Sequence, residues 1–307
     1  MRMKLGDNIL FTQNLADDKI IFAEEEEDVS DMLRMLEEQY ETWGMETNFT
    51  KIEYLVVRDA WTPRKQAHDR IIDGHPAGVG QFTHQALVLA DERYIRAGSL
   101  ITRTAVLTAA HNVVTYSKWT VRLGGIYRNQ DESTAWIVVS SWAQVHPEFN
   151  TSSYYSYDVA VIFLPEEAPL NSYINLVALP SFLEVNESFA GQRAQVSGWG
   201  YINGSEPCCP QNLLWTEVTV VPNTVCSEFY SAGYIIESTL CAGNDYSGIC
   251  RGDSGTALVL KTGGGFKQIG IAGYLTKDIC GAAGVPGAFT RVTSVLDWIT
   301  KTAQISV

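Results

Sequence analysis

Positive charge and long apolar runs are both scarce in this sequence. Its 307 residues include 22 Lys and Arg against 35 Asp and Glu, which gives a net charge of −13. A chain this acidic is a poor match for nucleic acid or for an acidic membrane surface. No stretch approaches the roughly 18 consecutive apolar residues that a membrane-spanning helix needs. We therefore expect neither nucleic-acid binding nor a membrane span, although the 46% hydrophobic content is enough for one large core or two smaller ones.

A secretory signal and N-terminal cysteines are also missing. The first 25 residues contain no apolar stretch of about 7–15 residues. All six cysteines lie in the last third of the chain: Cys208, Cys209, Cys226, Cys241, Cys250 and Cys280. An even number in one region predicts local disulfides, although spacing alone does not fix their pairing. Together with four Asn-x-Ser/Thr sequons, candidates for glycosylation, they favour a secreted protein; the sequons are at Asn48, Asn150, Asn186 and Asn203.

The composition changes near residue 70. Residues 1–70 hold 16 acidic and 9 basic residues, a net of −7, whereas residues 71–307 hold 19 and 13, a net of −6 over more than three times the length. Within the first part, residues 24–44 begin with an acidic run and then place apolar residues at helical spacing, which predicts a helix. Two interpretations stay open for this part: a segment that inhibits or chaperones the rest, or a solvated acidic helix with a flexible tail.

From residue 71 onward the pattern is that of β-strands. Short runs rich in Val, Ile, Thr and Tyr, such as QALVLADERY, AWIVVSSWAQV and YDVAVIFLP, alternate with Gly, Asn, Asp and Pro turn signals. This spacing predicts an antiparallel all-β fold, a barrel or a sandwich. Residues 292–304 carry an apolar stripe at helical spacing, which predicts a C-terminal helix.

Three short contexts carry the residue types of nucleophilic acyl transfer. His111 ends the apolar segment VLTAAHNV, Asp158 opens the apolar strand YDVAVIFLP, and Ser254 stands between glycines in GDSG. Acyl transfer needs a serine, a histidine that takes its proton, and a carboxylate that orients the histidine. Each context alone is common in proteins with no such chemistry. Their conjunction on an all-β background favours a catalytic serine.

With these motifs, and with SGWG at 197–200 and PGAFTRV at 286–292, residues 71–307 resemble the chymotrypsin/trypsin-like (S1-type) serine endopeptidases. The resemblance implies two packed six-stranded antiparallel β-barrels with a C-terminal helix, here preceded by a partly helical acidic pro-segment. It implies that His111 is the base, Asp158 its orienting carboxylate and Ser254 the nucleophile. The oxyanion hole would be the N–H groups of Gly252 and Ser254. The chemistry needs no metal or cofactor.

The segment DRIIDG resembles the activation site of the same family. A trypsin-like protease would cut the Arg70–Ile71 bond, and the new amino group of Ile71 would pair inside the protein with Asp253. A buried charge pair is stable only when both partners are present, so the cut would act as a switch. The expected domains are therefore a pro-segment, 1–70, and a peptidase domain, 71–307.

The resemblance also pairs four of the cysteines, Cys226 with Cys241 and Cys250 with Cys280. Two bridges that are common in the family are absent, and each has lost both ends: Arg96 and Asn112 occupy one pair of positions, and Ala194 and Leu260 the other. Cys208 and Cys209 are adjacent in an insertion with no family counterpart. They could form a vicinal disulfide or a bond to another chain.

The resemblance further indicates the substrate pocket. Its floor would be Gly248, and a buried arginine or lysine of a substrate would find no carboxylate there, so an apolar or aliphatic residue before the scissile bond is favoured. The other expected pocket residues are Arg251 at the entrance, Tyr274 along the substrate strand, and Leu275 and Gly287 in the walls.

Two functions stay open at this point. The leading one is a secreted zymogen of a serine endopeptidase that acts on proteins or peptides through a Ser254 acyl-enzyme, with serpin-type inhibitors as candidate partners. The alternative is a weakly active or inactive protease homologue that binds or regulates other proteins. Gly273 motivates the alternative, because a serine commonly supports the buried aspartate there, and so does Leu275, which stands where glycine is usual.

Overall fold

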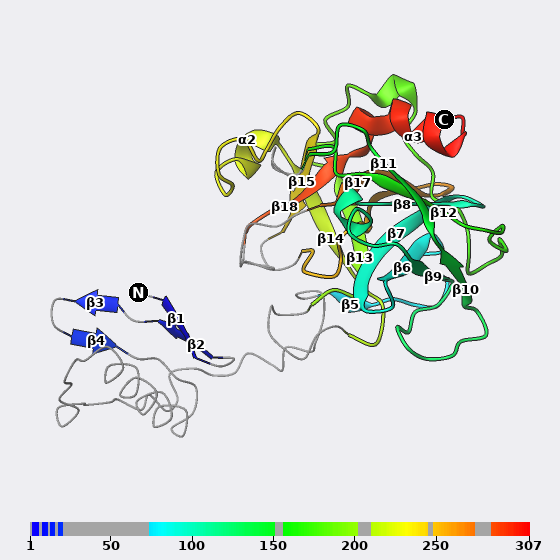
Figure 1. Ribbon diagram of the computed structural model, residues 1–307. Helices are drawn as coiled ribbons and strands as arrows, with labels where there is room; N and C mark the ends of the chain where they lie inside the picture. Colours follow the sequence, from blue (N-terminus) through cyan, green and yellow to red (C-terminus); the bar gives the residue numbers. More distant parts are fainter. Residues whose placement is uncertain are drawn as a thin grey trace. The chain divides into compact units, whose positions relative to one another are not determined.

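The structure is a computed structural model that describes residues 74–150, 156–201, 210–244, 248–273 and 284–307, together with four short strands near the N-terminus. The chain forms two compact units, Met1–Ala67 and His68–Val307. In the first unit, β1 (Arg2–Leu5) pairs antiparallel with β2 (Asn8–Phe11), and β3 (Gln13–Leu15) with β4 (Asp18–Ile20) (Figure 1). The helix predicted over residues 24–44 lies outside the described residues.

The first sheet of the second unit has seven antiparallel strands in the order β10-β9-β6-β7-β8-β12-β11. Strands β10 and β11 stand at opposite ends of this order, yet only Ser141 separates them along the chain, so the sheet curls into a half-barrel. Ser140 Oγ donates a 2.6 Å hydrogen bond to the carbonyl of Phe163 at the bend. The strands are β6 (Gln85–Ala90), β7 (Tyr94–Thr102), β8 (Ala105–Thr108), β9 (Trp119–Leu123), β10 (Trp136–Ser140), β11 (Trp142–Val145) and β12 (Ala160–Phe163).

The second sheet closes on itself. Its order is β13-β16-β17-β18-β15-β14, an additional β13–β14 pairing completes a six-stranded barrel, and β5 pairs with Leu214 and Trp215 at the start of β14. Closure leaves no unpaired edge among these six strands. The strands are β5 (His75–Pro76), β13 (Arg193–Gly198), β14 (Leu214–Val221), β15 (Thr239–Gly243), β16 (Ala257–Thr262), β17 (Gly265–Ala272) and β18 (Gly287–Arg291).

A shared apolar core joins the two sheets. Leu107 and Val161 from the first sheet and Val259 and Ile271 from the second belong to one buried cluster, which Ile299 of the C-terminal helix also enters. The predicted C-terminal helix is confirmed as a 3₁₀ turn, η5 (Val292–Val295), that continues into α3 (Leu296–Ala303). The predicted all-β architecture is confirmed as well, with one closed barrel and one curled half-barrel. In the described part of the chain, no helix has the length and apolarity that would let it cross a membrane.

A disulfide joins Cys226, in the short helix α2 (Asn223–Cys226), to Cys241 in β15. This is the pair that the family resemblance implied. Cys250 is also disulfide-bonded, and its expected partner, Cys280, lies outside the described residues.

Candidate active site

Two neighbouring strand ends bring His111 and Asp158 together. Strands β8 and β12 pair antiparallel, with Thr108 opposite Ala160. His111 lies in the three-residue 3₁₀ helix η2 (Ala110–Asn112), just after β8 ends, and Asp158 lies just before β12 begins. Antiparallel pairing sets the end of one strand beside the start of the other, so two residues 47 positions apart in the chain meet.

Asp158 holds His111 through both of its carboxylate oxygens. Oδ2 lies 2.7 Å from His111 Nδ1, and Oδ1 accepts a 2.9 Å hydrogen bond from the backbone N–H of His111. The side chain of Asp158 is 1% exposed, whereas that of His111 is 21% exposed. Because Asp158 Oδ2 is a buried hydrogen-bond acceptor beside Nδ1, the proton of the neutral ring stays on Nδ1. Nε2 is then the unprotonated nitrogen, which can act as a base. The pair has the geometry of a general base and its orienting carboxylate.

Neighbouring side chains hold the backbone at Asp158, and the sequence gives no signal for them. Thr290 Oγ1 donates a 3.0 Å hydrogen bond to the carbonyl of Asp158. Tyr157 has φ +52°, which is uncommon without glycine, and its ring stacks on His146 with centroids 4.9 Å apart. The backbone N–H of His146 donates to the carbonyl of Val159 at 3.1 Å, and burial lowers the pKa of His146. A neutral aromatic stack thus supports an unfavourable backbone conformation beside the carboxylate.

Ser254 lies on a tight turn before β16. The backbone conformation of this turn requires glycine at positions 252 and 255. φ is +95° at Gly252 and +89° at Gly255, a region that residues with a Cβ rarely adopt. A Cβ on Gly252 would lie 3.1 Å from Gly200 Cα, and one on Gly255 would overlap the carbonyl oxygen of Ala97. Within the described residues, the N–H groups of Gly252 and Ser254 donate to no protein acceptor. Both are therefore available to an oxyanion.

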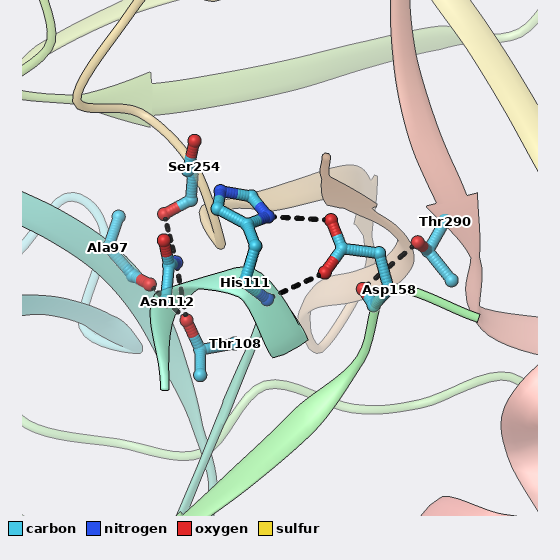
Figure 2. Close-up of polar contacts among 7 residues, drawn as sticks. All are labelled: Ala97, Thr108, His111, Asn112, Asp158, Ser254 and Thr290. Carbon is cyan, nitrogen blue, oxygen red and sulfur yellow. Dashed lines mark hydrogen bonds and ion pairs between the residues drawn. The ribbon is translucent and has the colours of Figure 1, made fainter. Parts of the chain in front are cut away.

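The turn of Ser254 is tied to the helix that carries His111. The Ser254 carbonyl accepts a 2.8 Å hydrogen bond from Asn112 Nδ2 and a 2.9 Å bond from the Ala97 N–H. Asn112 follows His111 directly in η2. In Figure 2 the imidazole ring lies between the Asp158 carboxylate and Ser254. The fold thus gathers the three residues that the motifs singled out, two from the first sheet and one from the second.

Asp253 is buried with its carboxylate among backbone N–H groups. Oδ1 accepts from Gly200 at 2.8 Å, and Oδ2 accepts from Cys250 at 2.9 Å. A Cβ on Gly198 or on Gly200 would overlap the carboxylate, so the glycines of SGWG make room for it. Burial raises the pKa of Asp253 from 3.8 to about 6, although the two N–H donors lower it. No cation contributes to this pKa, so the buried carboxylate has no opposite charge among the described residues.

The described part of the expected pocket is open at its floor. A Cβ on Gly248 would meet no atom of the described residues within 4 Å. Gly287 is buried in β18, where a Cβ would lie 2.9 Å from Ile249 Cγ1, and Arg251 is exposed. A Cβ on Gly273 would lie 3.5 Å from Asp158 Oδ2, an ordinary contact distance. There is room for a side chain at 273 against the Asp158 carboxylate.

The sequons at Asn150 and Asn186 are on the surface, since both side chains are exposed. Both are therefore accessible to glycosylation. The other predicted residues lie outside the described part of the chain: Asn48, Arg70, Ile71, Asn203, Cys208, Cys209, Tyr274, Leu275 and Cys280.

Comparison with known proteins gives consistent matches over the second unit. The family model described as Trypsin matches residues 71–299. The venom serine protease Bi-VSP of Bombus ignitus is 34% identical over 249 residues, which cover 75% of this chain and 68% of that protein. A collagenase of Hypoderma lineatum is 35% identical over 241 residues, covering 77% and 88%.

A solved structure extends the match to three dimensions. The structure titled HL collagenase is similar with a TM-score of 0.68 and 33% sequence identity, and the match covers 77% of this chain and 100% of that one. The family model covers the part of the chain that holds both sheets and the residues His111, Asp158 and Ser254. The chain therefore belongs to the trypsin family of serine endopeptidases.

Proposed function

We propose that the chain is a secreted zymogen that, once cut between Arg70 and Ile71, hydrolyses peptide bonds through an acyl-enzyme on Ser254. The observation that carries this proposal is the His111–Asp158 pair, bonded at 2.7 Å and tied through the next residue, Asn112, to the backbone of Ser254. A buried carboxylate, an exposed imidazole edge and a serine between glycines are the parts that acyl transfer requires.

In the proposed mechanism Ser254 Oγ attacks the carbonyl carbon of the scissile bond while Nε2 of His111 takes the hydroxyl proton. The negative charge that develops on the carbonyl oxygen is stabilised by the N–H groups of Gly252 and Ser254. The His111 imidazolium, stabilised by Asp158, then gives its proton to the leaving amine as the C–N bond breaks. A water molecule, deprotonated by His111, hydrolyses the acyl-enzyme and restores the Ser254 hydroxyl.

The environment of Asp253 supports activation by cleavage. Its carboxylate is buried, its pKa is raised to about 6 by burial, and among the described residues its hydrogen bonds come from the backbone N–H groups of Gly200 and Cys250. An ammonium group delivered by Ile71 would neutralise that charge in a site where both ions need a partner. Since Asp253 directly precedes Ser254, the pair would order the turn that holds the nucleophile and the oxyanion hole.

The decisive experiment is labelling with a serine-directed fluorophosphonate. The full chain cut at Arg70 by trypsin should be labelled, and the Ser254→Ala variant, cut in the same way, should not. An Arg70→Gln variant, which trypsin cannot cut at this bond, controls for the dependence on activation and should be labelled much more slowly. A correctly cut chain that takes no label contradicts the proposal and supports the alternative, an inactive homologue that binds other proteins.

Secretion is proposed on the disulfides and on the exposed sequons. Cys226–Cys241 is formed, Cys250 is bonded, and Asn150 and Asn186 are accessible. Disulfides of this kind persist in oxidising compartments. Protein or peptide substrates, an activating trypsin-like protease and serpin-type inhibitors are the partners that this function implies.

The pocket floor leads to a prediction about specificity. A Cβ at Gly248 meets no described residue within 4 Å, so Gly248→Asp should place a carboxylate in open space at the proposed floor. We expect kcat/KM for substrates with arginine before the scissile bond to rise at least about tenfold, because a desolvated cation would gain a partner. Matched p-nitroanilides with alanine, leucine and arginine at that position measure the change.

The neutral variant Gly248→Asn, of nearly the same shape, controls for the added volume. The wild-type protein should prefer the alanine and leucine substrates. Efficient cleavage after arginine by the wild-type protein, or an equal gain in Gly248→Asn and Gly248→Asp, would count against Gly248 as the floor of an apolar pocket.

A further inference from the structure

A closed ring of hydrogen bonds connects Ser254, Asn112, Thr108 and Ala97, and its contacts at Asn112 and Thr108 can be followed in Figure 2. Asn112 Nδ2 donates to the Ser254 carbonyl at 2.8 Å and to Thr108 Oγ1 at 3.0 Å. Thr108 Oγ1 donates to the carbonyl of Ala97 at 2.7 Å. The N–H of Ala97 closes the ring with a 2.9 Å bond to the Ser254 carbonyl. Both hydrogens of the Asn112 amide are used, one of them on the residue proposed as the nucleophile.

We infer that Asn112 is a positioning residue for catalysis, since its amide fixes the backbone of Ser254 at a set distance from the helix that carries His111. The inference rests on the proposed function of Ser254. Asn112 and His111 are consecutive in η2. Any shift of η2 therefore moves the base together with the amide that binds the Ser254 carbonyl. The distance between Nε2 and Oγ is thereby kept constant, as proton transfer requires.

The surroundings of the ring leave it little freedom. Thr108 and Asn112 are completely buried, and Ala97 is 1% exposed. Gly255 packs against the ring so closely that a Cβ there would overlap both Ala97 O and Thr108 Oγ1 and lie 2.6 Å from Asn112 Nδ2. Trp119 Nε1 donates to the Asn112 carbonyl at 3.2 Å and holds the asparagine from its other side.

Within the described part of the chain, the amide of Asn112 forms hydrogen bonds through its NH₂ group and not through its oxygen. Oδ1 is buried and accepts no hydrogen bond from the described residues. A buried acceptor without a donor is destabilising, so an apolar side chain of the same branching would serve the fold as well. An asparagine that is unfavourable for stability and yet bonded to the nucleophile is what a role in catalysis predicts.

The ring also lies where the family commonly has a disulfide that this chain lacks. Arg96 and Asn112 occupy the two positions where the resemblance places the family's cysteines. Arg96 turns to other partners, donating to the carbonyl of Ile95 at 2.8 Å and to the Tyr116 hydroxyl at 3.2 Å. The link between β7 and η2 therefore runs through hydrogen bonds, and in this chain it includes Ser254 itself.

The test is Asn112→Leu in the full chain cut at Arg70. Leucine keeps the branching at Cγ and removes both donors. We expect kcat per titrated active site to fall about tenfold with KM unchanged, because small displacements of reacting groups are costly. The free energy of unfolding, measured in urea, should change little.

The matched control is Asn223→Leu. Asn223 Nδ2 also donates twice, to the carbonyls of Ile236 at 2.9 Å and Thr239 at 3.0 Å, and its Oδ1 is likewise buried without a donor. By the same argument that variant should change stability little, and it should keep kcat. Two variants of Thr108 test the ring even if Asn112→Leu does not fold. Thr108→Val removes the hydroxyl that accepts from the Asn112 amide and should lower kcat, whereas Thr108→Ser retains the hydroxyl and should not.

Unchanged kcat per active site in both Asn112→Leu and Thr108→Val overturns the inference, whatever their stabilities. An inactive wild-type protein contradicts the proposed function instead, and then hydrogen exchange in the uncut full chain decides about Asn112. The Ala97 N–H donates to the same carbonyl, so it should exchange faster in Asn112→Leu than in Asn223→Leu. Equal exchange rates in these two variants overturn the inference.

Discussion

The Asp158→Asn variant of the activated protein is expected to lose about four orders of magnitude in kcat, with KM little changed. Both carboxylate oxygens of Asp158 accept from His111, one from the backbone N–H at 2.9 Å and one from Nδ1 at 2.7 Å. A carboxamide has a single acceptor oxygen. If that oxygen stays on the backbone N–H, the NH₂ group faces Nδ1 and makes it an acceptor, which moves the ring proton to Nε2. The nitrogen that should take the proton of Ser254 is then blocked.

The measurement is kcat for one peptide substrate, expressed per molecule of folded protein. Asp297→Asn is a suitable control because this aspartate is exposed in α3, where it pairs with Lys301. An exposed pair of this kind contributes little to stability, and kcat should be unchanged. A loss of less than about tenfold in Asp158→Asn would mean that the carboxylate does not set the tautomer of His111.

Residues whose role follows from their own chemistry could be predicted from the sequence. His111, Asp158 and Ser254 stand in short motifs, and the glycines beside Ser254 are required by the backbone of the same turn. Strands and the C-terminal helix follow from local periodicity. These features need only neighbours in the chain, so a single sequence contains enough information to identify them.

Features that depend on distant neighbours could not be predicted. Asn112 contacts a residue 142 positions away, and nothing around it in the sequence distinguishes it from other asparagines. The stack of Tyr157 on His146 likewise joins different segments. The run AWIVVSSWAQV has the pattern of one long strand, yet a bend at Ser141 divides it into β10 and β11 at opposite ends of the curled sheet. Alternation along a strand does not report such a bend, because the side chains keep period two on both sides.

The charge of Asp253 gives the second prediction. In the activated protein, Asp253→Asn should lower kcat/KM by at least about a hundredfold. Removing one partner of a buried ion pair costs about 3–5 kcal/mol, and a free energy of that size shifts most molecules out of the competent form. The oxyanion donors Gly252 and Ser254 flank Asp253, so the loss should appear mainly in kcat.

The uncut chain should respond to pH in the opposite sense from an ordinary salt-bridged aspartate. The pKa of Asp253 is raised by burial from 3.8 to about 6, so the folded chain binds this proton more tightly than the unfolded chain. The contribution of Asp253 to stability is therefore most favourable below pH 4, falls as the pH rises from about 4 to 6, and stays low above pH 6. Over that window the contribution of Asp253 to the free energy of unfolding should decrease by about 3 kcal/mol.

Urea unfolding of the uncut wild-type chain and of uncut Asp253→Asn at several pH values between 4 and 7 isolates this contribution, because asparagine does not titrate. The free energy of unfolding of the wild-type chain should decrease relative to that of Asp253→Asn as the pH rises. After cleavage at Arg70 the Ile71 ammonium would become the partner of Asp253, lower its pKa and abolish the decrease. A wild-type chain with the same pH dependence before and after cleavage would show that Asp253 receives no new charge partner, and the cut at Arg70 could not act through this carboxylate.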